Sequence, residues 1–367
     1  MTELKAIARA AETLRQKAEP FVLATVVRVR GSAYRRPGAR MLVTRDRWVA
    51  GSVSGGCAER DVLERGFWHT MGGAPRLVTY DSRPDDDDAP THFGVGCDGA
   101  IDVLLEPETQ SVQDSISFIS RCCERQERGA LATVFGGDEK LGARLALYED
   151  GAAIASELDD VTRESLLEEC RRVLATRRTS VVRCRSASGV LDALVEAVRP
   201  PPRLFVVGAG HDAVPVVTLA RTVGWETTVC ERSTRFVTRE RFAHADEIVA
   251  GRPLDIAERV AECDRALAVV MAHDYERDRA CLSALLETGV VYIGMLGPRR
   301  RTARMLEELG VTVGDLRVHA PVGLALGAES PEEIALSIIA EAQAALTGAH
   351  AAPLSSGGGT IHAAAGN

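Results

Sequence analysis

A chain of 367 residues is long enough for two or three domains and for a substantial buried core. Hydrophobic residues make up 46% of it and charged residues 26%, which is ordinary for a globular protein and excludes a low-complexity chain. The formal net charge of −8 argues against a protein that grips nucleic acid over its whole surface. The longest apolar runs, 266–272 and 320–328, are too short to cross a bilayer, so we expect no membrane span.

The N-terminal stretch 1–17 carries charges throughout and has apolar residues at helical spacing, which predicts an amphipathic helix and not a signal peptide. The residues on its apolar face are Leu4, Ile7, Ala11 and Leu14. Nine cysteines, an odd number spread along the chain, do not form the dense even framework of a small secreted domain. We therefore expect reduced thiols in a cytoplasmic protein.

Residues 1–199 are predicted to form one domain of mixed α+β structure. From Phe21 onward, short apolar and β-branched runs separated by glycine, proline and charged turns indicate antiparallel strands. Three stretches have helical periodicity: 57–71, 115–129 and 158–176. The segment 81–99 is rich in Asp, Pro and Gly, and loops of that length are usually functional or disordered. No internal repeat is expected.

The proline run 200–202 can continue neither a helix nor a central strand, so we place a domain boundary there. Beyond it, strands that are apolar from end to end alternate with helices, which predicts a parallel sheet covered on both faces. Residues 200–347 are thus expected to form a doubly wound α/β domain. Its last helix should begin after Ser330, which forms a capping box with Glu333. The remaining residues, 348–367, have too little apolar content to fold and are predicted to be a disordered tail.

A glycine motif, GAGHDA at 208–213, follows the first strand of the second domain and opens a helix. In a dinucleotide-binding turn of this form, Gly208 would permit the tight turn and Gly210 would let the backbone approach a pyrophosphate, near His211. Glu231 ends the next apolar run, where an acid would bind a ribose hydroxyl. The same glycines can serve packing alone, and both interpretations stay open. Arg232, directly after Glu231, would tolerate a 2′-phosphate, so the sequence does not distinguish NAD from NADP.

A second candidate site is the segment 51–59, in which a strand ends in a glycine turn and a helix begins near Cys57. Backbone N–H groups at the start of a helix hold anions, and a thiol there is partly deprotonated, which suits a soft metal ligand or a sulfur carrier. The alternative is a buried cysteine beside a serine N-cap. Because glycines bring the backbone close to whatever binds, we favour a binding site made of Ser54, Gly55, Gly56 and Cys57.

Two further segments have the composition of a ligand site. Cys97 lies among glycines just before a strand, where flexible backbone favours the close approach of a ligand. The run 28–40 contains five arginines and no acid in a hairpin-like turn, so Arg35 and Arg36 are candidates for binding an anion. A solvated turn on an edge strand explains the arginines equally well. Two cysteines in separate loops do not make a structural zinc site.

Six motifs occur in a characteristic order: GSAYRRPGARMLV, GSVSGGCAE, GVGCDGAIDVLLEP, LFVVGAGHDAV, YIGMLGPRRR and HAPVGLALGAESPEEIALSIIAE. This order resembles the XdhC/CoxI family of molybdenum-hydroxylase accessory proteins over nearly the whole chain. The resemblance implies an N-terminal XdhC domain followed by a Rossmann-like domain. It further implies a protein that binds the molybdenum cofactor (molybdopterin), assists its sulfuration by a cysteine desulfurase and inserts it into a xanthine dehydrogenase-type apoenzyme, without turnover of its own.

On this resemblance the SGGC motif of the family falls on 54–57, which makes Cys57 the candidate metal ligand. The second cysteine motif falls on Cys97, where Asp98 replaces the usual glycine. A homo-oligomer is also expected. The alternative function is an NAD(P)-dependent oxidoreductase that uses the Gly208 turn with His211 or His273 as the proton-transferring residue. The sequence has no Tyr-x-x-x-Lys or comparable signature for that chemistry, and the oxidoreductase interpretation leaves the Cys57 turn unexplained.

Overall fold

The structure is a computed structural model, and it describes residues 2–81, 99–137, 140–156, 158–233, 235, 237–311 and 315–356. The chain divides into two compact units, Met1–Pro200 (unit 1) and Pro201–Asn367 (unit 2). Much of the predicted tail, 357–367, lies outside the described residues, and the part before it ends in a short 3₁₀ turn at Leu354–Ser356. Among the described residues we find no helix with the length and apolar character of a membrane span.

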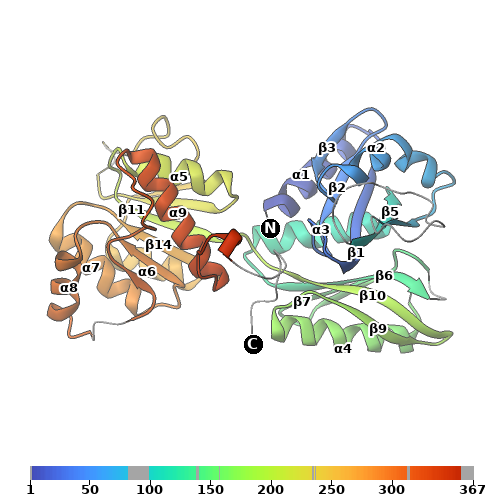
Figure 1. Ribbon diagram of the computed structural model, residues 1–367. Helices are drawn as coiled ribbons and strands as arrows, with labels where there is room; N and C mark the ends of the chain where they lie inside the picture. The colour runs from blue at the N-terminus through green and yellow to red at the C-terminus, as the bar shows by residue number, and fades with distance from the viewer. Residues whose placement is uncertain are drawn as a thin grey trace. The chain divides into compact units, whose positions relative to one another are not determined.

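The described residues of unit 1 form two five-stranded antiparallel sheets and four helices (Figure 1). The first sheet has the order β3-β2-β1-β5-β4, with β1 (Val22–Gly31), β2 (Arg40–Val43), β3 (Trp48–Gly51), β4 (Arg76–Asp81) and β5 (Gly99–Pro107). The second has the order β8-β7-β6-β10-β9, with β6 (Gly129–Gly137), β7 (Arg144–Tyr148), β8 (Ala153–Ala155), β9 (Ser180–Ser186) and β10 (Gly189–Val198). The helices are α1 (Thr2–Gln16), α2 (Cys57–His69), α3 (Gln110–Glu124) and α4 (Asp160–Thr176).

Each sheet of unit 1 has one helix on its outer face and meets the other sheet on its inner face. Val62 of α2 packs on the first sheet, and Leu166 of α4 packs on the second. Between the sheets, α1 and α3 join a shared core, and Val27 of β1 packs in one cluster with Phe135 of β6. The apolar face predicted for the N-terminal helix is confirmed, since Ile7, like Ala11 and Leu14, is buried.

The two sheets have the same topology, which corrects the expectation that the chain has no internal repeat. In each, three strands form a meander, a helix follows, and two further strands complete the sheet beside the first strand of the meander. We call β1–β5 the first copy and β6–β10 the second copy. Short identities mark the equivalent strands: LATV at 23–26 and 131–134, GAR at 38–40 and 142–144, and D-x-L-x-E at 102–106 and 192–196.

Unit 2 is a doubly wound α/β domain, as predicted. Its parallel sheet has the order β13-β12-β11-β14-β15-β16, with β11 (Arg203–Val207), β12 (Glu226–Cys230), β13 (Glu247–Val249), β14 (Ala266–Val270), β15 (Tyr292–Met295) and β16 (Val318–His319). The helices are α5 (Ala213–Thr222), α6 (Pro253–Ala261), α7 (Tyr275–Leu286), α8 (Arg299–Glu308) and α9 (Pro331–Thr347). Helices α5 and α9 cover one face, and α6, α7 and α8 cover the other (Figure 1).

The strand order of unit 2 reverses between β11 and β14, and doubly wound sheets bind ligands outside the carboxyl ends of the strands at such a reversal. The predicted start of the last helix is confirmed. Ser330 Oγ accepts a hydrogen bond from the Glu333 N–H at 3.3 Å, and the Glu333 carboxylate accepts one from the Ser330 N–H at 3.0 Å.

Candidate functional site

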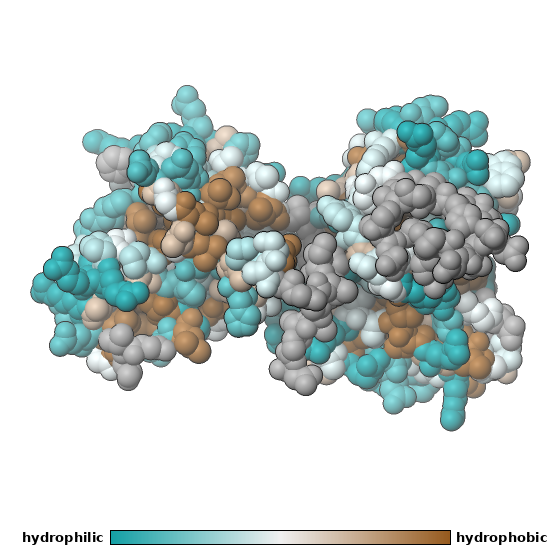
Figure 2. Space-filling model, in the orientation of Figure 1, coloured by the Kyte–Doolittle hydropathy of each residue, from teal (hydrophilic) through white to brown (hydrophobic). Residues whose placement is uncertain are grey.

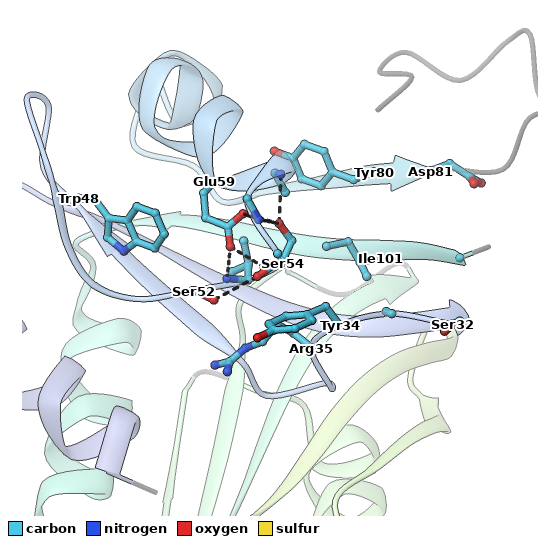
Figure 3. A pocket seen from close by; sticks show the side chains of 16 residues that line it. Ser32, Tyr34, Arg35, Trp48, Ser52, Ser54, Glu59, Tyr80, Asp81 and Ile101 are labelled. Carbon is cyan, nitrogen blue, oxygen red and sulfur yellow. Dashed lines mark hydrogen bonds between the residues drawn. The ribbon is translucent and has the colours of Figure 1, made fainter. Parts of the chain in front are cut away.

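A pocket of about 570 Å³ opens in unit 1 where the β1–β2 hairpin, the turn before α2 and the adjoining ends of β4 and β5 meet (Figure 3). This volume lies within the roughly 300–1,000 Å³ typical of small-molecule sites. The lining is formed by 32–35, 52–56, Ala58 and Glu59, together with Trp48, Tyr80, Asp81, Gly99 and Ile101. The space-filling view of the same orientation as Figure 1 is given in Figure 2.

Several residues predicted from the sequence come together at this pocket. Ser54, Gly55, Gly56 and Arg35 all line it. Cys57 is the first residue of α2, between two residues that line the pocket. By contrast, Arg36 is exposed and does not line it, and Cys97 lies outside the described residues.

The Glu59 carboxylate organises the turn before α2. It accepts hydrogen bonds from the N–H groups of Val53 at 3.1 Å, Ser54 at 2.7 Å and Gly56 at 3.0 Å, and from the Ser54 hydroxyl. The Ser54 oxygen in turn accepts the Gly56 and Ala58 N–H groups, both at 3.2 Å. These amides were predicted to cradle a bound anion, and most of them are instead occupied by the protein's own carboxylate. In the 53–56 turn of the described chain, the Gly55 N–H alone has no such partner.

Glu59 is a buried carboxylate whose charge is stabilised locally. Burial by itself raises the pKa of Glu59, but the hydrogen bonds from the Ser54 hydroxyl and from the backbone of Ser54 and Gly56 outweigh it, and they hold the pKa below its ordinary value. The carboxylate is therefore ionised at neutral pH. Nothing in the sequence pattern distinguishes it from an ordinary acid in the first turn of a helix.

Gly56 needs to be glycine because of its backbone conformation. Its φ is +127°, which side-chain-bearing residues rarely adopt, while no heavy atom of the described residues lies within 4 Å of the position that a Cβ would take. Within the described part of the chain, the space beside Gly56 is therefore open. At Gly55 a Cβ would lie 3.7 Å from the Tyr34 ring, so this ring packs over the turn.

Aromatic side chains form part of the pocket wall, and single aromatic residues in turns gave no sequence signal. Tyr34 and Trp48 are 67% and 47% exposed, so both rings present area to a ligand (Figure 3). Tyr80 is buried and donates a hydrogen bond to Asp61 at 2.8 Å. Burial first, and then this hydrogen bond, raise the pKa of Tyr80, so its phenol stays protonated.

The predicted anion site in the arginine run is largely replaced by internal ion pairs. Four of the five arginines bind carboxylates of unit 1: Arg28 and Arg30 bind Asp102, Arg35 binds Glu3, and Arg40 binds Glu196. Arg40 is also buried, so it is a structural residue. Within the described residues, Arg36 makes no side-chain hydrogen bond or ion pair.

In unit 2 the glycine turn lies at the carboxyl end of β11. Gly208 has a φ of +120°, and a Cβ there would lie 2.5 Å from the Met271 carbonyl oxygen, so packing against the chain after β14 requires a glycine. A Cβ at Gly210 would lie 2.3 Å from Asp212 Oδ1. The other oxygen of Asp212 is 3.1 Å from His273 Nε2. Asp212 thus places a carboxylate at the start of α5, where a pyrophosphate would lie.

The remaining nucleotide-site residues of unit 2 are arranged as follows. Glu231 follows β12, and its carboxylate accepts hydrogen bonds from Arg277 Nη1 at 2.7 Å and from the Arg232 N–H at 2.6 Å. His211 is exposed in the turn before α5. The residues predicted to bind a nucleotide therefore gather in unit 2, whereas those around Cys57 gather in unit 1. Among the described residues no group of three His, Cys, Asp or Glu side chains forms a metal-ligand cluster.

Comparison with known proteins gives a consistent result. Residues 14–81 match the model of the XdhC and CoxI family, and residues 204–342 match that of the XdhC Rossmann domain. Over 332 residues the chain is 30% identical to a Bacillus subtilis protein described as a probable xanthine dehydrogenase subunit, with 90% of this chain and 94% of the relative covered. It is 26% identical to the molybdenum cofactor insertion chaperone PaoD of Escherichia coli, over 87% of this chain and 81% of that protein.

Among solved structures, the fold is similar to a crystal structure described as a xanthine dehydrogenase from Bacillus halodurans. The TM-score is 0.76 with 27% sequence identity, and the match covers 95% of this chain and 98% of the other. The two family models match the chain in the order N-terminal domain, then Rossmann domain, and the relative from Bacillus subtilis covers both ranges. The chain therefore belongs to the XdhC/CoxI family.

Proposed function

We propose that this protein is a molybdenum cofactor insertion chaperone for a xanthine dehydrogenase-type hydroxylase, and that the cofactor is held as cargo in the pocket of unit 1. The Escherichia coli relative named as an insertion chaperone and the Bacillus subtilis relative named for xanthine dehydrogenase support the first part. The observation that carries the second part is that the 52–56 turn lines a pocket of suitable volume and leads directly into Cys57.

The chemistry of the pocket suits a phosphorylated dithiolene on a planar pterin. Trp48 lines the pocket and is 47% exposed, so its ring can stack on a flat ring, and Tyr34 adds aromatic surface to the same wall. The Gly55 N–H and the open space before Gly56 suit the close approach of polar cargo atoms to the backbone. A thiol at Cys57 supplies a soft ligand for the metal or a site for transferable sulfur.

Charge determines how the cargo is oriented in this proposal. Glu59 and Asp81 line the pocket and repel a phosphate, whereas Arg35 is the cation among the described residues of the wall. We therefore place the phosphate toward Arg35, which would exchange part of its contact with Glu3 for the cargo. Arg36, exposed on the same hairpin, is proposed to contact the phosphate or an acidic partner surface.

The proposal includes two kinds of partner, a hydroxylase apoenzyme that receives the cargo and a cysteine desulfurase that serves its sulfuration. It also includes self-association of the chain. In this view the protein has no turnover of its own. The oxidoreductase alternative has less support, because Asp212 occupies the start of α5 and Arg277 pairs with Glu231, the predicted ribose-binding acid.

The direct test is the cargo content of the protein isolated without oxygen from molybdate-replete cells. We expect molybdenum and pterin in equal amounts, about one of each per chain. The same protein from cells that lack molybdopterin synthesis should contain neither and should take up released cofactor when the two are mixed. Protein that is free of pterin under both conditions and takes up none would contradict the proposal.

A further inference from the structure

The two copies in unit 1 have the same strand register. In the first copy Val26 pairs with Val103 and Arg28 with Asp102, so the register shifts at Val27. In the second copy Val134 pairs with Ala193 and Gly136 with Asp192, so the same shift falls at Phe135. A bulge at equivalent positions, together with the shared strand order, shows that unit 1 is a duplicated fold.

Reciprocal ion pairs join the copies. Arg40 of the first copy binds Glu196 of the second through two hydrogen bonds, at 2.8 and 2.6 Å. At the equivalent place, Arg144 of the second copy binds Glu106 of the first, at 2.9 and 2.5 Å. Each copy gives the arginine to one pair and the glutamate to the other, as a two-fold relation requires.

The copies differ where the pocket lies. The hairpin between the first two strands spans 27–37 in the first copy and only 135–141 in the second. The connection between the last two strands differs in length as well. In the first copy Asp81 pairs with Ala100, so residues 82–99 separate the paired ends of β4 and β5. In the second copy Ser186 pairs with Gly189, so only two residues connect β9 to β10. The segments that line the pocket border these longer connections.

The helix that follows the third strand differs as well. In the first copy α2 has Gly56 at its N-cap, and no other described residue lies within 4 Å of the position of its absent Cβ. In the second copy α4 has Asp159 there, and its side chain accepts hydrogen bonds from the N–H groups of Val161 at 2.9 Å and Thr162 at 3.0 Å. The N-cap residue itself thus caps α4, whereas α2 is capped from Ser54 and Glu59, and its glycine N-cap lines the pocket.

We infer that the first copy alone binds the cargo, and that the second copy positions the binding hairpin of the first through Glu196. This inference rests on the proposed function. Arg40 Nη1 donates to both Glu196 and the carbonyl oxygen of Gly38, at 2.8 and 2.9 Å. A Cβ at Gly38 would lie 2.6 Å from Glu196 Oε1, so the carboxylate abuts the backbone at the base of the hairpin. That hairpin carries Tyr34 and Arg35 into the pocket.

The duplication supplies a matched control for this role. Glu106 makes the same contacts with Arg144, which donates to the Gly142 carbonyl oxygen at 2.9 Å, and a Cβ at Gly142 would lie 2.5 Å from Glu106. Glu196 and Glu106 are 4% and 1% exposed, so Glu196→Gln and Glu106→Gln make equivalent changes in equally buried pairs. Only the first of them acts on the hairpin that lines the pocket.

The experiment compares cofactor retention and amide hydrogen exchange in the two variants of the full chain. Glu196→Gln is expected to lower retained molybdenum and pterin at least about tenfold and to accelerate exchange over 31–39. Glu106→Gln should accelerate exchange over 135–141, the hairpin of the second copy. It should retain cofactor within about twofold of the unsubstituted protein. If either glutamine variant fails to fold, Arg40→Lys and Arg144→Lys keep the charges, lose the bidentate contact, and should show the same asymmetry.

Equal loss of cofactor in both variants would overturn the inference, because it would mean that general instability causes the loss. Unchanged retention in Glu196→Gln would overturn it as well. If the unsubstituted protein binds no cofactor, the proposed function fails, and hydrogen exchange alone decides the positioning role. Faster exchange over 31–39 confined to Glu196→Gln then supports that role, and unaltered exchange there refutes it.

Discussion

Replacing Cys57 with alanine is expected to remove most of the molybdenum and pterin that the protein retains, a loss of at least about tenfold in affinity. The reason is that Cys57 is the first residue of α2, between residues that line the pocket, and the proposal assigns the soft ligand to its thiol. The fold should be unaffected, because Ser54 and Glu59 hold the start of α2 without the thiol. Metal and pterin analysis of the purified variant measures the effect.

Cys263→Ala is the matched control, since Cys263 is a half-buried thiol of unit 2 that has no part in the pocket. It should retain the cofactor as the unsubstituted protein does. Equal cofactor content in Cys57→Ala and the unsubstituted protein would refute the role assigned to Cys57. A comparable drop in the Cys263 variant would refute it too, because loss would then not depend on the pocket.

Glu59→Gln is expected to destabilise unit 1 by about 3 kcal/mol and to disorder the turn that lines the pocket. The amide nitrogen of glutamine cannot accept the hydrogen bonds that one carboxylate oxygen now takes, so buried N–H groups among Val53, Ser54 and Gly56 lose their acceptor. Chemical denaturation measures the stability. Glu333→Gln changes a similar but exposed capping glutamate at the start of α9 and should have much less effect.

The effect of Glu59 should depend on pH in a defined direction. Because the pKa of Glu59 is lowered in the folded state, its stabilisation is complete above the unfolded-state value of about 4.3 and is lost as the pH falls through the folded pKa. The stability difference between the unsubstituted protein and Glu59→Gln should therefore be constant near neutrality and shrink below about pH 4. A difference that does not change with acidification would contradict the role of the charge.

Most elements of the fold follow from periodicity, but the duplication does not. Apolar runs and helical spacing predict the doubly wound unit, because its strands β12, β14 and β15 are buried along their whole length. The strands β9 and β10 were not predicted. In β9 exposed residues alternate with less exposed ones, and its arginines mask the apolar pattern. Without β9 and β10 the second sheet is incomplete, and its likeness to the first is hidden.

The turn of the candidate site could be predicted from its glycines. The contacts that residues far apart in the sequence make with one another could not. Ser54, Gly55 and Gly56 stand out in the sequence as a glycine turn, and Gly56 has the positive φ that favours glycine. The ion pairs of the arginine run could not be predicted, because the carboxylates that bind Arg28 and Arg40 lie 74 and 156 residues away in the sequence. The role of Glu59 was not predicted, because only the folded turn brings the N–H groups of Val53, Ser54 and Gly56 within hydrogen-bond distance of its carboxylate.

Titration of cofactor-loaded protein into a cofactor-free xanthine dehydrogenase-type hydroxylase tests the central claim most directly. A carrier acts in proportion to its amount, whereas an enzyme multiplies its effect with each turnover. We predict that recovered hydroxylase activity rises linearly and reaches its plateau at about one loaded chain per cofactor site. Molybdenum and pterin should leave the chaperone in proportion to the activity recovered. No recovery with fully loaded protein, or repeated turnover of a small substrate by the protein without any apoenzyme, would contradict the account.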